Sequence, residues 1–338
     1  MRTPEELLAL ADINPELEQI IKKHGPIQSL AADSDIPKIR QMLLDRKREM
    51  TAAMQSAEEK EAYVEEDRQI PVRDGSTITV RIHKPKHPAK DGCPIFVVYH
   101  GGGFCLGGLD SEVLLCRRFT ELGGIAVNID YRLAPEHPFP VPPQDAYDAL
   151  KWTAENFTQL GGNPTKGFLV GGISAGASFS AVVSLLYRDD KLSPPLTGVY
   201  LSIPPCMSEN LVPEKYKSVW LSREQNKNAP ILNNDSIGLF ERLYNPDPQS
   251  KYRTPMLFES HQNLPPTYFQ ICGMDPLRDE AFIYEEILRE ENGVKTKVDI
   301  YPGLPHGFWS YFPEAGFSKK LQEDCVGGMK WLLEQSSS

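Results

Sequence analysis

Phe168-Leu-Val-Gly-Gly-Ile-Ser174-Ala-Gly-Ala-Ser-Phe-Ser-Ala-Val-Val-Ser-Leu-Leu186 joins a short apolar run to a helical run through a serine that stands between two glycines. The pattern predicts a buried strand, a sharp turn and a helix, with Ser174 at the apex of the turn. Gly172 and Gly176 leave room beside a serine whose backbone is strained in such a turn. A serine at the start of a helix also has backbone N–H groups beside it, which suits the stabilisation of a developing oxyanion. Ser174 is therefore the candidate nucleophile.

A second glycine-rich segment, His100-Gly-Gly-Gly-Phe104, follows the apolar run Ile95–Tyr99. Three glycines after a strand let the main chain approach a bound carbonyl and point N–H donors at its oxygen. We expect the N–H groups of Gly102, Gly103 and Ala175 to form this oxyanion hole. A phosphate-binding loop is disfavoured, because no Gly-Lys-Ser/Thr follows and the G-x-G-x-x-G spacing is not met.

The catalytic base and acid are expected on loops at the same edge of the sheet as the nucleophile. Of the seven histidines, only His306 lies beyond the last expected strand, and it is the candidate base. Asp275 follows the run 267–272 and is the candidate acid, which would fix the imidazole tautomer and stabilise the imidazolium. Asp279 is the rival carboxylate, but we expect it in the next helix, pointing away. His100 is interpreted as a structural hydrogen-bonding group that holds its loop.

Short apolar runs alternate with helical stretches along most of the chain. A leading hairpin is predicted from 69–73 and 77–82 around Asp74-Gly75. Further strands are expected at 94–99, 125–129, 168–170, 198–203, 267–272 and 297–301, and helices at 111–122, 145–157, 175–187, 278–289 and 319–333. Buried strands that alternate with helices predict an α/β fold, a mostly parallel sheet flanked by helices on both faces.

Two segments fall outside this alternation. Residues 1–62 are helical in character, and residues 204–262 are too long for a simple connection. We interpret both as parts of a helical cap over a core formed by 63–203 and 263–338. The inserted segment would place Tyr216, Trp220, Phe240 and Leu243 over Ser174.

The chain order Ser, Asp, His is that of the α/β-hydrolase fold. The sequence resembles the hormone-sensitive-lipase-like branch of that fold over roughly residues 68–335. The resemblance rests on five ordered motifs: His100-Gly-Gly-Gly-Phe104, Tyr131-Arg-Leu-Ala-Pro-Glu-His-Pro-Phe-Pro140, Gly172-Ile-Ser-Ala-Gly176, Asp275-Pro-Leu-Arg-Asp-Glu280 and His306-Gly-Phe308. It implies an esterase for short to medium acyl chains, without a cofactor and with a cap built partly from the N-terminus.

The nucleophile motif departs from the common pattern of the branch. Members often carry Asp before the serine and Gly-Asn after the second glycine, where this chain has Ile173, Ala177 and Ser178. This leaves the serine in place and removes any role for a preceding carboxylate. The chain is more similar to fungal members, some of which deacylate secondary metabolites, than to the common bacterial ones.

Composition narrows the classes of partner. A formal net charge of -10 argues against a nucleic-acid partner. The first 24 residues lack the apolar core of a signal peptide, and no window approaches a membrane span, so we expect a cytoplasmic protein without a membrane partner. The six cysteines are scattered without CxxC spacing, which favours free thiols and argues against a zinc site. The expected partner is a small-molecule ester, and the chain would act as a monomer or homodimer.

The leading hypothesis is a serine carboxylic-ester hydrolase that works through an acyl-enzyme. A serine amidase or peptidase stays open, because the same three residues can cleave amides. A ligand receptor on the same fold is a third reading. Plant gibberellin receptors resemble this branch but have lost the catalytic histidine, whereas His306 is present here.

Overall fold

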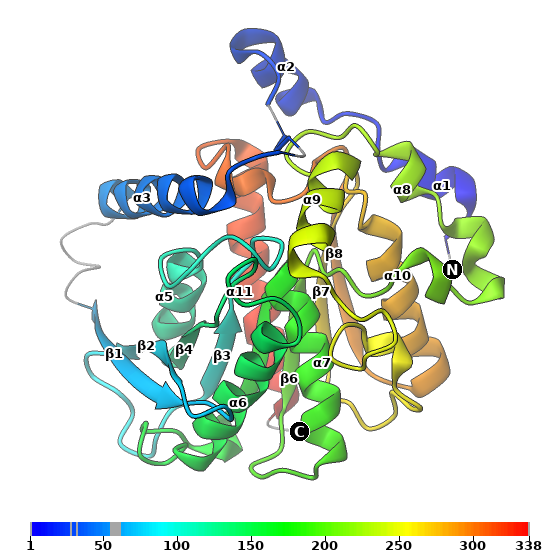
Figure 1. Cartoon of the computed structure of the whole chain (residues 1–338). Coiled ribbons are helices and arrows are strands. Elements are labelled where there is room, and N and C mark those ends of the chain that lie inside the picture. Colours follow the sequence, from blue (N-terminus) through cyan, green and yellow to red (C-terminus); the bar gives the residue numbers. More distant parts are fainter. Residues whose placement is uncertain (1, 28, 32, 55–61, 337–338) are drawn as a thin grey trace.

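An eight-stranded sheet runs through the middle of the molecule (Figure 1), in a computed structural model that describes residues 2–27, 29–31, 33–54 and 62–336. The strands are, in chain order, β1 (Tyr63–Pro71), β2 (Thr77–Pro85), β3 (Ile95–Tyr99), β4 (Ile125–Asp130), β5 (Phe168–Ile173), β6 (Gly198–Ser202), β7 (Thr267–Cys272) and β8 (Thr296–Tyr301). Their order across the sheet is β1-β2-β4-β3-β5-β6-β7-β8. The hairpin β1–β2 pairs antiparallel, β2 pairs antiparallel with β4, and all remaining neighbours are parallel. The predicted fold class is confirmed.

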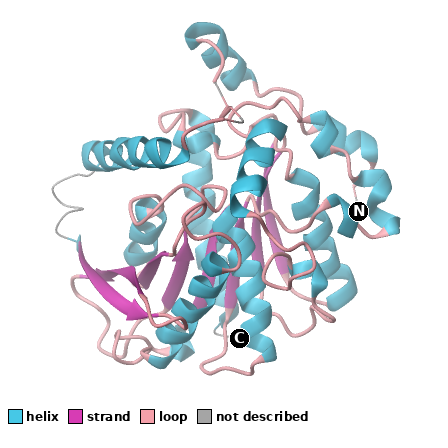
Figure 2. Ribbon diagram, in the orientation of Figure 1, coloured by secondary structure: helices cyan, strands magenta, loops and turns pink. Residues whose placement is uncertain are grey.

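Helices cover both faces of the sheet (Figure 2). The described α-helices are α1 (Pro4–Ala9), α2 (Pro15–His24), α3 (Ile36–Met54), α5 (Val113–Glu121), α6 (Val141–Glu155), α7 (Ala175–Asp189), α8 (Ser222–Gln225), α9 (Asn234–Tyr244), α10 (Arg278–Glu286) and α11 (Gly316–Ser336). Helices α5 and α11 contact each other and pack on one face, whereas α6, α7 and α10 pack on the other. A mostly parallel sheet covered in this way explains why its central strands are apolar throughout.

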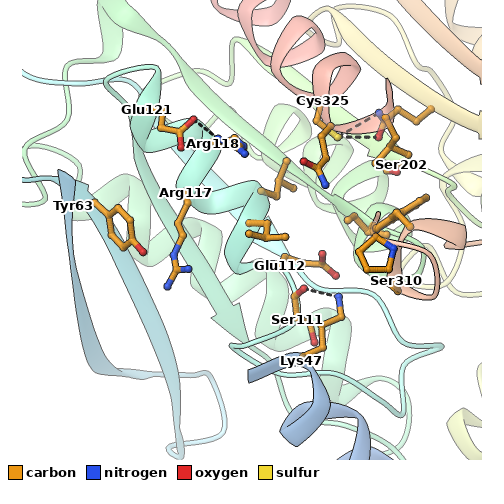
Figure 3. Close-up of a pocket in the computed structure, with 18 residues that line it drawn as sticks. Lys47, Tyr63, Ser111, Glu112, Arg117, Arg118, Glu121, Ser202, Ser310 and Cys325 are labelled. Carbon is orange, nitrogen blue, oxygen red and sulfur yellow. Dashed lines mark hydrogen bonds and ion pairs between the residues drawn. The ribbon is translucent and has the colours of Figure 1, made fainter. Parts of the chain in front are cut away.

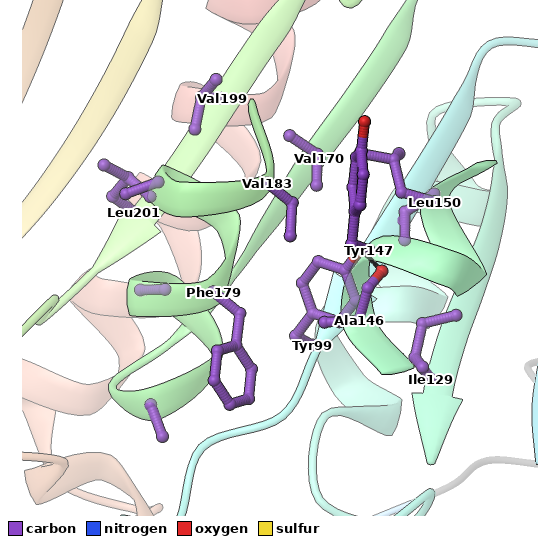
Figure 4. Packing of buried hydrophobic residues seen from close by; sticks show 14 of the residues in the cluster. Tyr99, Ile129, Ala146, Tyr147, Leu150, Val170, Phe179, Val183, Val199 and Leu201 are labelled. Atoms are coloured by element: carbon purple, nitrogen blue, oxygen red, sulfur yellow. Dashed lines mark hydrogen bonds between the residues drawn. The ribbon is translucent and has the colours of Figure 1, made fainter. Parts of the chain in front are cut away.

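The side chains of strand β3 pack into the hydrophobic cores on both faces of the sheet. All five of its residues are buried, and alternate side chains point to opposite faces. Phe96 and Val98 belong to the core under α5 and α11, while Val97 and Tyr99 belong to the larger core under α6 and α7. Figure 4 shows Tyr99 beside Ala146 of α6, to whose carbonyl oxygen the Tyr99 hydroxyl donates a hydrogen bond of 2.7 Å.

The predicted helices are present, with different ends. Helix α6 begins at Val141, four residues before the expected start, because Pro142 and Pro143 occupy its first turn. Proline is tolerated there, since the N–H groups of the first turn have no partner within the helix. Helix α10 ends at Glu286 and continues as a π-helical turn over Ile287–Glu291.

The helices of the two segments assigned to a cap, α1, α2 and α3 from one and α8 and α9 from the other, lie in the upper half of the view in Figure 1. Segment 204–262 contains two α-helices, α8 and α9, with short 3-10 helices before them at Glu209–Leu211 and Glu214–Val219 and after them at Pro255–Leu257. The expected helical character of 1–62 holds for α1, α2 and α3, and the parts of that prediction at residues 1, 28, 32 and 55–61 lie outside the described residues.

Gly171 of β5 should be intolerant of any side chain. A Cβ at this position would lie 2.5 Å from the Cβ of Tyr200 on the neighbouring strand. We expect Gly171→Ala to lower the free energy of unfolding by roughly 1–3 kcal/mol through overpacking. The matched control is Gly238→Ala on an exposed position of α9, where nothing lies within 4 Å of the added Cβ. This change should raise stability by up to about 1 kcal/mol. Chemical denaturation of both variants checks the prediction, and equal shifts would contradict it.

Candidate active site

Ser174 stands at the turn between β5 and α7 with a backbone φ of +52° and ψ of -118°. This conformation is strained for a residue with a side chain. The turn also lies close to the end of β3, since a Cβ at Gly172 would lie 2.4 Å from the Tyr99 carbonyl oxygen and one at Gly176 would lie 2.0 Å from it. Only glycine fits at either position. The Ser174 N–H donates to the carbonyl of Ser202 on β6 at 2.8 Å, which fixes the turn to the next strand.

The structure brings the three predicted side chains Ser174, Asp275 and His306 together. His306 Nε2 lies 2.9 Å from Ser174 Oγ, and His306 Nδ1 lies 2.6 Å from Asp275 Oδ2. Asp275 and His306 follow β7 and β8, as the parallel sheet predicts. Both side chains are buried, with exposed fractions of 1% for Asp275 and 8% for His306. Because a carboxylate only accepts, the Asp275 contact places the ring proton on Nδ1 and leaves Nε2 to accept from the serine hydroxyl.

Hydrogen bonds within the loops and from distant segments hold the loops that carry Asp275 and His306. Asp275 Oδ1 accepts a hydrogen bond from Leu277 N at 2.8 Å, and Asn226 at the end of α8 donates to the Asp275 carbonyl at 3.1 Å. Gly303 N, three residues before His306, donates to the Leu10 carbonyl at 2.8 Å, and its own carbonyl accepts from Asn14 at 3.1 Å. The N-terminal segment therefore packs on the loop that positions His306.

The glycine loop presents its backbone to the same site. Gly102 and Gly103 have φ values of +128° and +58°, which favour glycine. A Cβ at Gly103 would lie 2.5 Å from the Phe240 ring of α9, so the loop also touches segment 204–262. Within the described part of the chain, the N–H groups of Gly102, Gly103 and Ala175 donate no hydrogen bond. All three residues line the same cavity as Ser174.

His100 holds this loop, as the sequence suggested. Its ring is buried and stacks on Tyr131 with a centroid distance of 4.2 Å. His100 Nδ1 donates to the Gly101 carbonyl at 2.8 Å, and the Tyr131 hydroxyl donates to the His100 carbonyl at 2.7 Å. Burial lowers the pKa of His100 to about 4, so its ring is neutral at physiological pH. Glu112, which the sequence analysis did not single out, accepts from Gly101 N at 3.2 Å.

Asp279 lies in the first turn of α10 and is engaged elsewhere. Its Oδ2 accepts from the N–H groups of Leu221 and Ser222, each at 2.6 Å, and its Oδ1 accepts from Arg278 Nε at 2.7 Å. With an exposed fraction of 1%, the carboxylate joins α10 to the start of α8. This geometry agrees with the expectation that Asp279 points away from His306.

Ser174 and His306 open onto a cavity of about 460 Å³. Volumes of this order suit a small organic ligand. Apolar side chains come from α3, from the loop at Leu30 and from α9, with Ile39, Leu43 and Phe240 among them. Ile39 and Leu43 carry no local sequence signal of function, because they meet the site only through the tertiary fold.

A smaller cavity of about 140 Å³ lies beside the first, between α5 and α11 (Figure 3). Lys47, Ser111, Glu112 and Trp309 line both cavities, so one layer of side chains separates them. The figure shows Lys47 of α3 reaching Ser111, to whose carbonyl its Nζ donates at 3.0 Å. This hydrogen bond ties α3 to the wall between the two cavities.

Of the four side chains expected over Ser174, only Phe240 lines the cavity. Tyr216 is buried elsewhere, and its hydroxyl donates to Glu291 at 2.6 Å. Trp220 and Leu243 pack against the large core and do not line the cavity. The expectation was wrong for these three residues. Tyr216 lies in the turn over Glu214–Val219, which packs against α1 and the π-helical turn, and Trp220 directly follows that turn. Leu243 lies on α9 and packs against the large core instead.

A family model described as the alpha/beta hydrolase fold matches residues 96–310, which include both glycine motifs, Asp275 and His306. The chain belongs to this family. Versiconal hemiacetal acetate esterase of Dothistroma septosporum is 39% identical over 76% of this chain and 79% of that protein. Carboxylesterase NlhH of Mycobacterium tuberculosis is 33% identical over 91% of this chain and 92% of that protein.

Among solved structures, the chain is similar to vibralactone cyclase, with a TM-score of 0.88 and 34% identity over 98% of this chain and 97% of that chain. Together with the family match, these relatives make the protein a hydrolase of the carboxylesterase type, and the resemblance to the hormone-sensitive-lipase-like branch is confirmed. No helix within the described ranges is long and apolar enough to cross a membrane. The described residues also hold no group of three or more His, Cys, Asp or Glu side chains that could bind a metal ion.

Proposed function

We propose that this protein is a serine carboxylic-ester hydrolase that cleaves small esters with short- to medium-chain acyl groups through an acyl-enzyme. The observation that carries the proposal is the chain of contacts from Asp275 through His306 to Ser174, at 2.6 Å and 2.9 Å, beside three N–H groups without a partner among the described residues. This arrangement supplies a nucleophile, a base, an orienting acid and an oxyanion hole.

In the first half of the reaction, Ser174 Oγ attacks the ester carbonyl carbon while His306 Nε2 takes the hydroxyl proton. The carbonyl electron pair moves onto oxygen, where the N–H groups of Gly102, Gly103 and Ala175 stabilise the negative charge. Asp275 stabilises the imidazolium and keeps Nδ1 protonated. Collapse of the tetrahedral intermediate expels the alcohol oxygen, which takes its proton from His306 Nε2, and the acyl group stays on Ser174.

In the second half, a water molecule replaces the alcohol. His306 Nε2 takes a proton from the water as it attacks the acyl carbon, and the same three N–H groups hold the second oxyanion. Collapse releases the carboxylic acid and returns the proton to Ser174 Oγ. Besides the ester and one water molecule, the cycle uses only the side chains and backbone groups named above.

We further propose that residues 1–62 and 204–262 form a cap over a core made of 63–203 and 263–338. Support comes from the cavity, whose walls include Ile39 and Leu43 of α3 and Phe240 of α9 as well as Ser174 of the core. A cap of this kind excludes bulk water from the oxyanion and shapes the space for the acyl and alcohol groups.

The proposed substrates include esters of small secondary metabolites. Support comes from the similarity to versiconal hemiacetal acetate esterase, at 39% identity over 261 residues. It also comes from Ile173, which stands before Ser174 where common members of the branch often carry Asp.

Ser174→Ala should abolish turnover and leave folding intact, because only the nucleophile is removed. Loss of such a residue lowers kcat by about 10⁶. The measurement is hydrolysis of p-nitrophenyl acetate beside p-nitroacetanilide, so that esterase and amidase rates are compared on one panel. Retention of more than a few percent of wild-type activity would reject Ser174 as the nucleophile. Faster cleavage of the anilide than of the ester would favour an amidase, and no turnover of either by the wild type would favour a receptor.

Asp275→Asn and Asp279→Asn form a matched pair. The first should lower kcat by about 10⁴ through the wrong imidazole tautomer. The second should lower stability instead, because a neutral amide leaves the buried Arg278 without a charged partner. We expect its Tm to fall while the kcat of the folded enzyme stays within about tenfold of wild type. Steady-state kinetics and thermal unfolding check both variants, and a reversed pattern would identify Asp279 as the acid.

Substrate length should be limited by the cavity. Each CH₂ buried against its apolar walls adds about 0.8 kcal/mol until the space is full, after which a longer chain clashes. We expect the best kcat/KM on acetyl to hexanoyl esters and very little activity on long-chain triglycerides. The measurement is kcat/KM across p-nitrophenyl esters from C2 to C16. An optimum at C12 or beyond, or activation at an emulsion interface, would make the protein a lipase.

A further inference from the structure

Four cationic side chains line the cavity of Ser174, against two carboxylates. The cations are Arg46, Lys47, Arg223 and Arg253, and the carboxylates are Glu112 and Glu241. The lining therefore holds more cationic than anionic side chains, whereas the chain as a whole carries a formal net charge of -10. Side chains of one sign around a cavity attract ligands of the other sign.

Arg253 is the most unusual of these groups, because its side chain is only 7% exposed. Its Nη2 donates to Glu241 Oε1 at 2.5 Å, and its guanidinium carbon lies 5.6 Å from the centroid of the Phe104 ring. Within the described residues, Nε and Nη1 of Arg253 donate no hydrogen bond. A buried guanidinium keeps its charge and is costly unless its N–H groups find acceptors. The arginine therefore presents unused donors at the cavity wall.

Arg223 supplies a second guanidinium on the same side. Its Nη2 donates to the buried carboxylate of Glu280, and it has no other hydrogen bond in the described part of the chain. Thr254, the neighbour of Arg253 in the chain, donates to the carbonyl of Cys206, whose own N–H donates to Glu280, so hydrogen bonds connect the surroundings of the two arginines, and both line the same cavity. Glu280 is committed to the backbone as well, since it accepts from the N–H groups of Cys206 and Met207.

Two contacts place Arg253 relative to the proposed oxyanion donors Gly102 and Gly103. Its guanidinium lies over Phe104, the residue that directly follows the Gly102-Gly103 donors. Its partner Glu241 is adjacent in α9 to Phe240, whose ring blocks any side chain at Gly103. Arg253 therefore lies in the cavity wall next to the glycine loop. A substrate group that extends from the scissile carbonyl toward the glycine loop would meet it.

We propose that Arg253 and Arg223 form a carboxylate-binding subsite, which selects esters that carry a carboxylate remote from the scissile bond. Guanidinium groups bind carboxylates through paired N–H donors, and such charge-assisted hydrogen bonds are the strong ones. Neither residue takes part in bond breaking; they determine specificity. The inference rests on the proposed esterase function and narrows its substrate class.

The test uses two pairs of esters, each with a charged member and a neutral analogue of similar shape. One pair carries the charge on the acyl side, mono-p-nitrophenyl adipate beside p-nitrophenyl 6-oxoheptanoate. The other carries it on the alcohol side, 4-acetoxybenzoate beside 4-acetoxybenzamide. The readout is the ratio of kcat/KM for the charged ester to that for the neutral ester, which does not depend on the fraction of folded enzyme.

We expect the wild type to favour the charged member of at least one pair, and Arg253→Met to lower that ratio by about 10- to 100-fold. Glu241→Gln should raise the ratio by about 3- to 10-fold, because it removes the carboxylate that competes for Arg253. The matched control is Arg68→Met, which removes the same charge from a partly exposed residue of β1 that is paired with Glu66 and lies outside the cavity lining. Its ratio should stay within about twofold of wild type.

A ratio below one for both pairs in the wild type would overturn the subsite. So would equal losses in Arg253→Met and Glu241→Gln, since these indicate that the ion pair only holds α9 in place. Binding separates this inference from the proposed function: in a Ser174→Ala background, the dissociation constants of the same esters are measured directly. If the wild type cleaves none of these esters, the esterase proposal fails. The subsite is then decided by binding alone: tighter binding of the charged member supports it, and weaker binding contradicts it.

Discussion

The close approach of the Ser174 turn to the end of β3 is the contact on which the site depends. Gly172 and Gly176 lie so near the Tyr99 carbonyl that neither position accepts a side chain. Tyr99 is followed at once by His100 and the glycine loop. A single approach of two backbones therefore places the candidate nucleophile beside the candidate oxyanion donors. The parallel order of β3, β5, β7 and β8 then brings the loops of Asp275 and His306 to the same edge.

The features that could be predicted from the sequence are those that depend on local sequence patterns and on the topology of a parallel sheet. The strand–turn–helix around Ser174, the glycines after β3 and the loops after β7 and β8 each carry a short-range signal, and a parallel sheet brings them together. The hydrogen-bond geometry of the three side chains agrees with that reasoning. Their roles in catalysis remain predictions for the kinetic experiments to decide.

Other features could not be read from the chain, because they depend on contacts between distant segments. The hydrogen bond from Gly303 to Leu10 joins residues separated by most of the sequence, and no sequence pattern near either residue predicts it. The same holds for Arg253, which looks like an ordinary surface arginine in a polar stretch until the fold buries it against Phe104. The failure for Tyr216 has a similar origin: its aromatic character indicated burial, which is correct, but not which surface it would cover.

The segments that line the cavity also hold the loops that carry the chemistry. Leu10 and Asn14 are both hydrogen-bonded to Gly303, which lies three residues before His306. Asn226 donates to the Asp275 carbonyl. Phe240 lies so close to Gly103 that no side chain fits there. Under the proposed function, covering the substrate and aligning the candidate acid and base are therefore not independent tasks in this fold. A displacement of these segments that widened the cavity would also release the supports of Asp275 and His306. Hydrogen-bonded side chains such as Ser174, His306 and Asp275 act together only when they are aligned within a fraction of an ångström. Residues that never touch the scissile bond thus constrain how far the cavity can adapt to a new substrate.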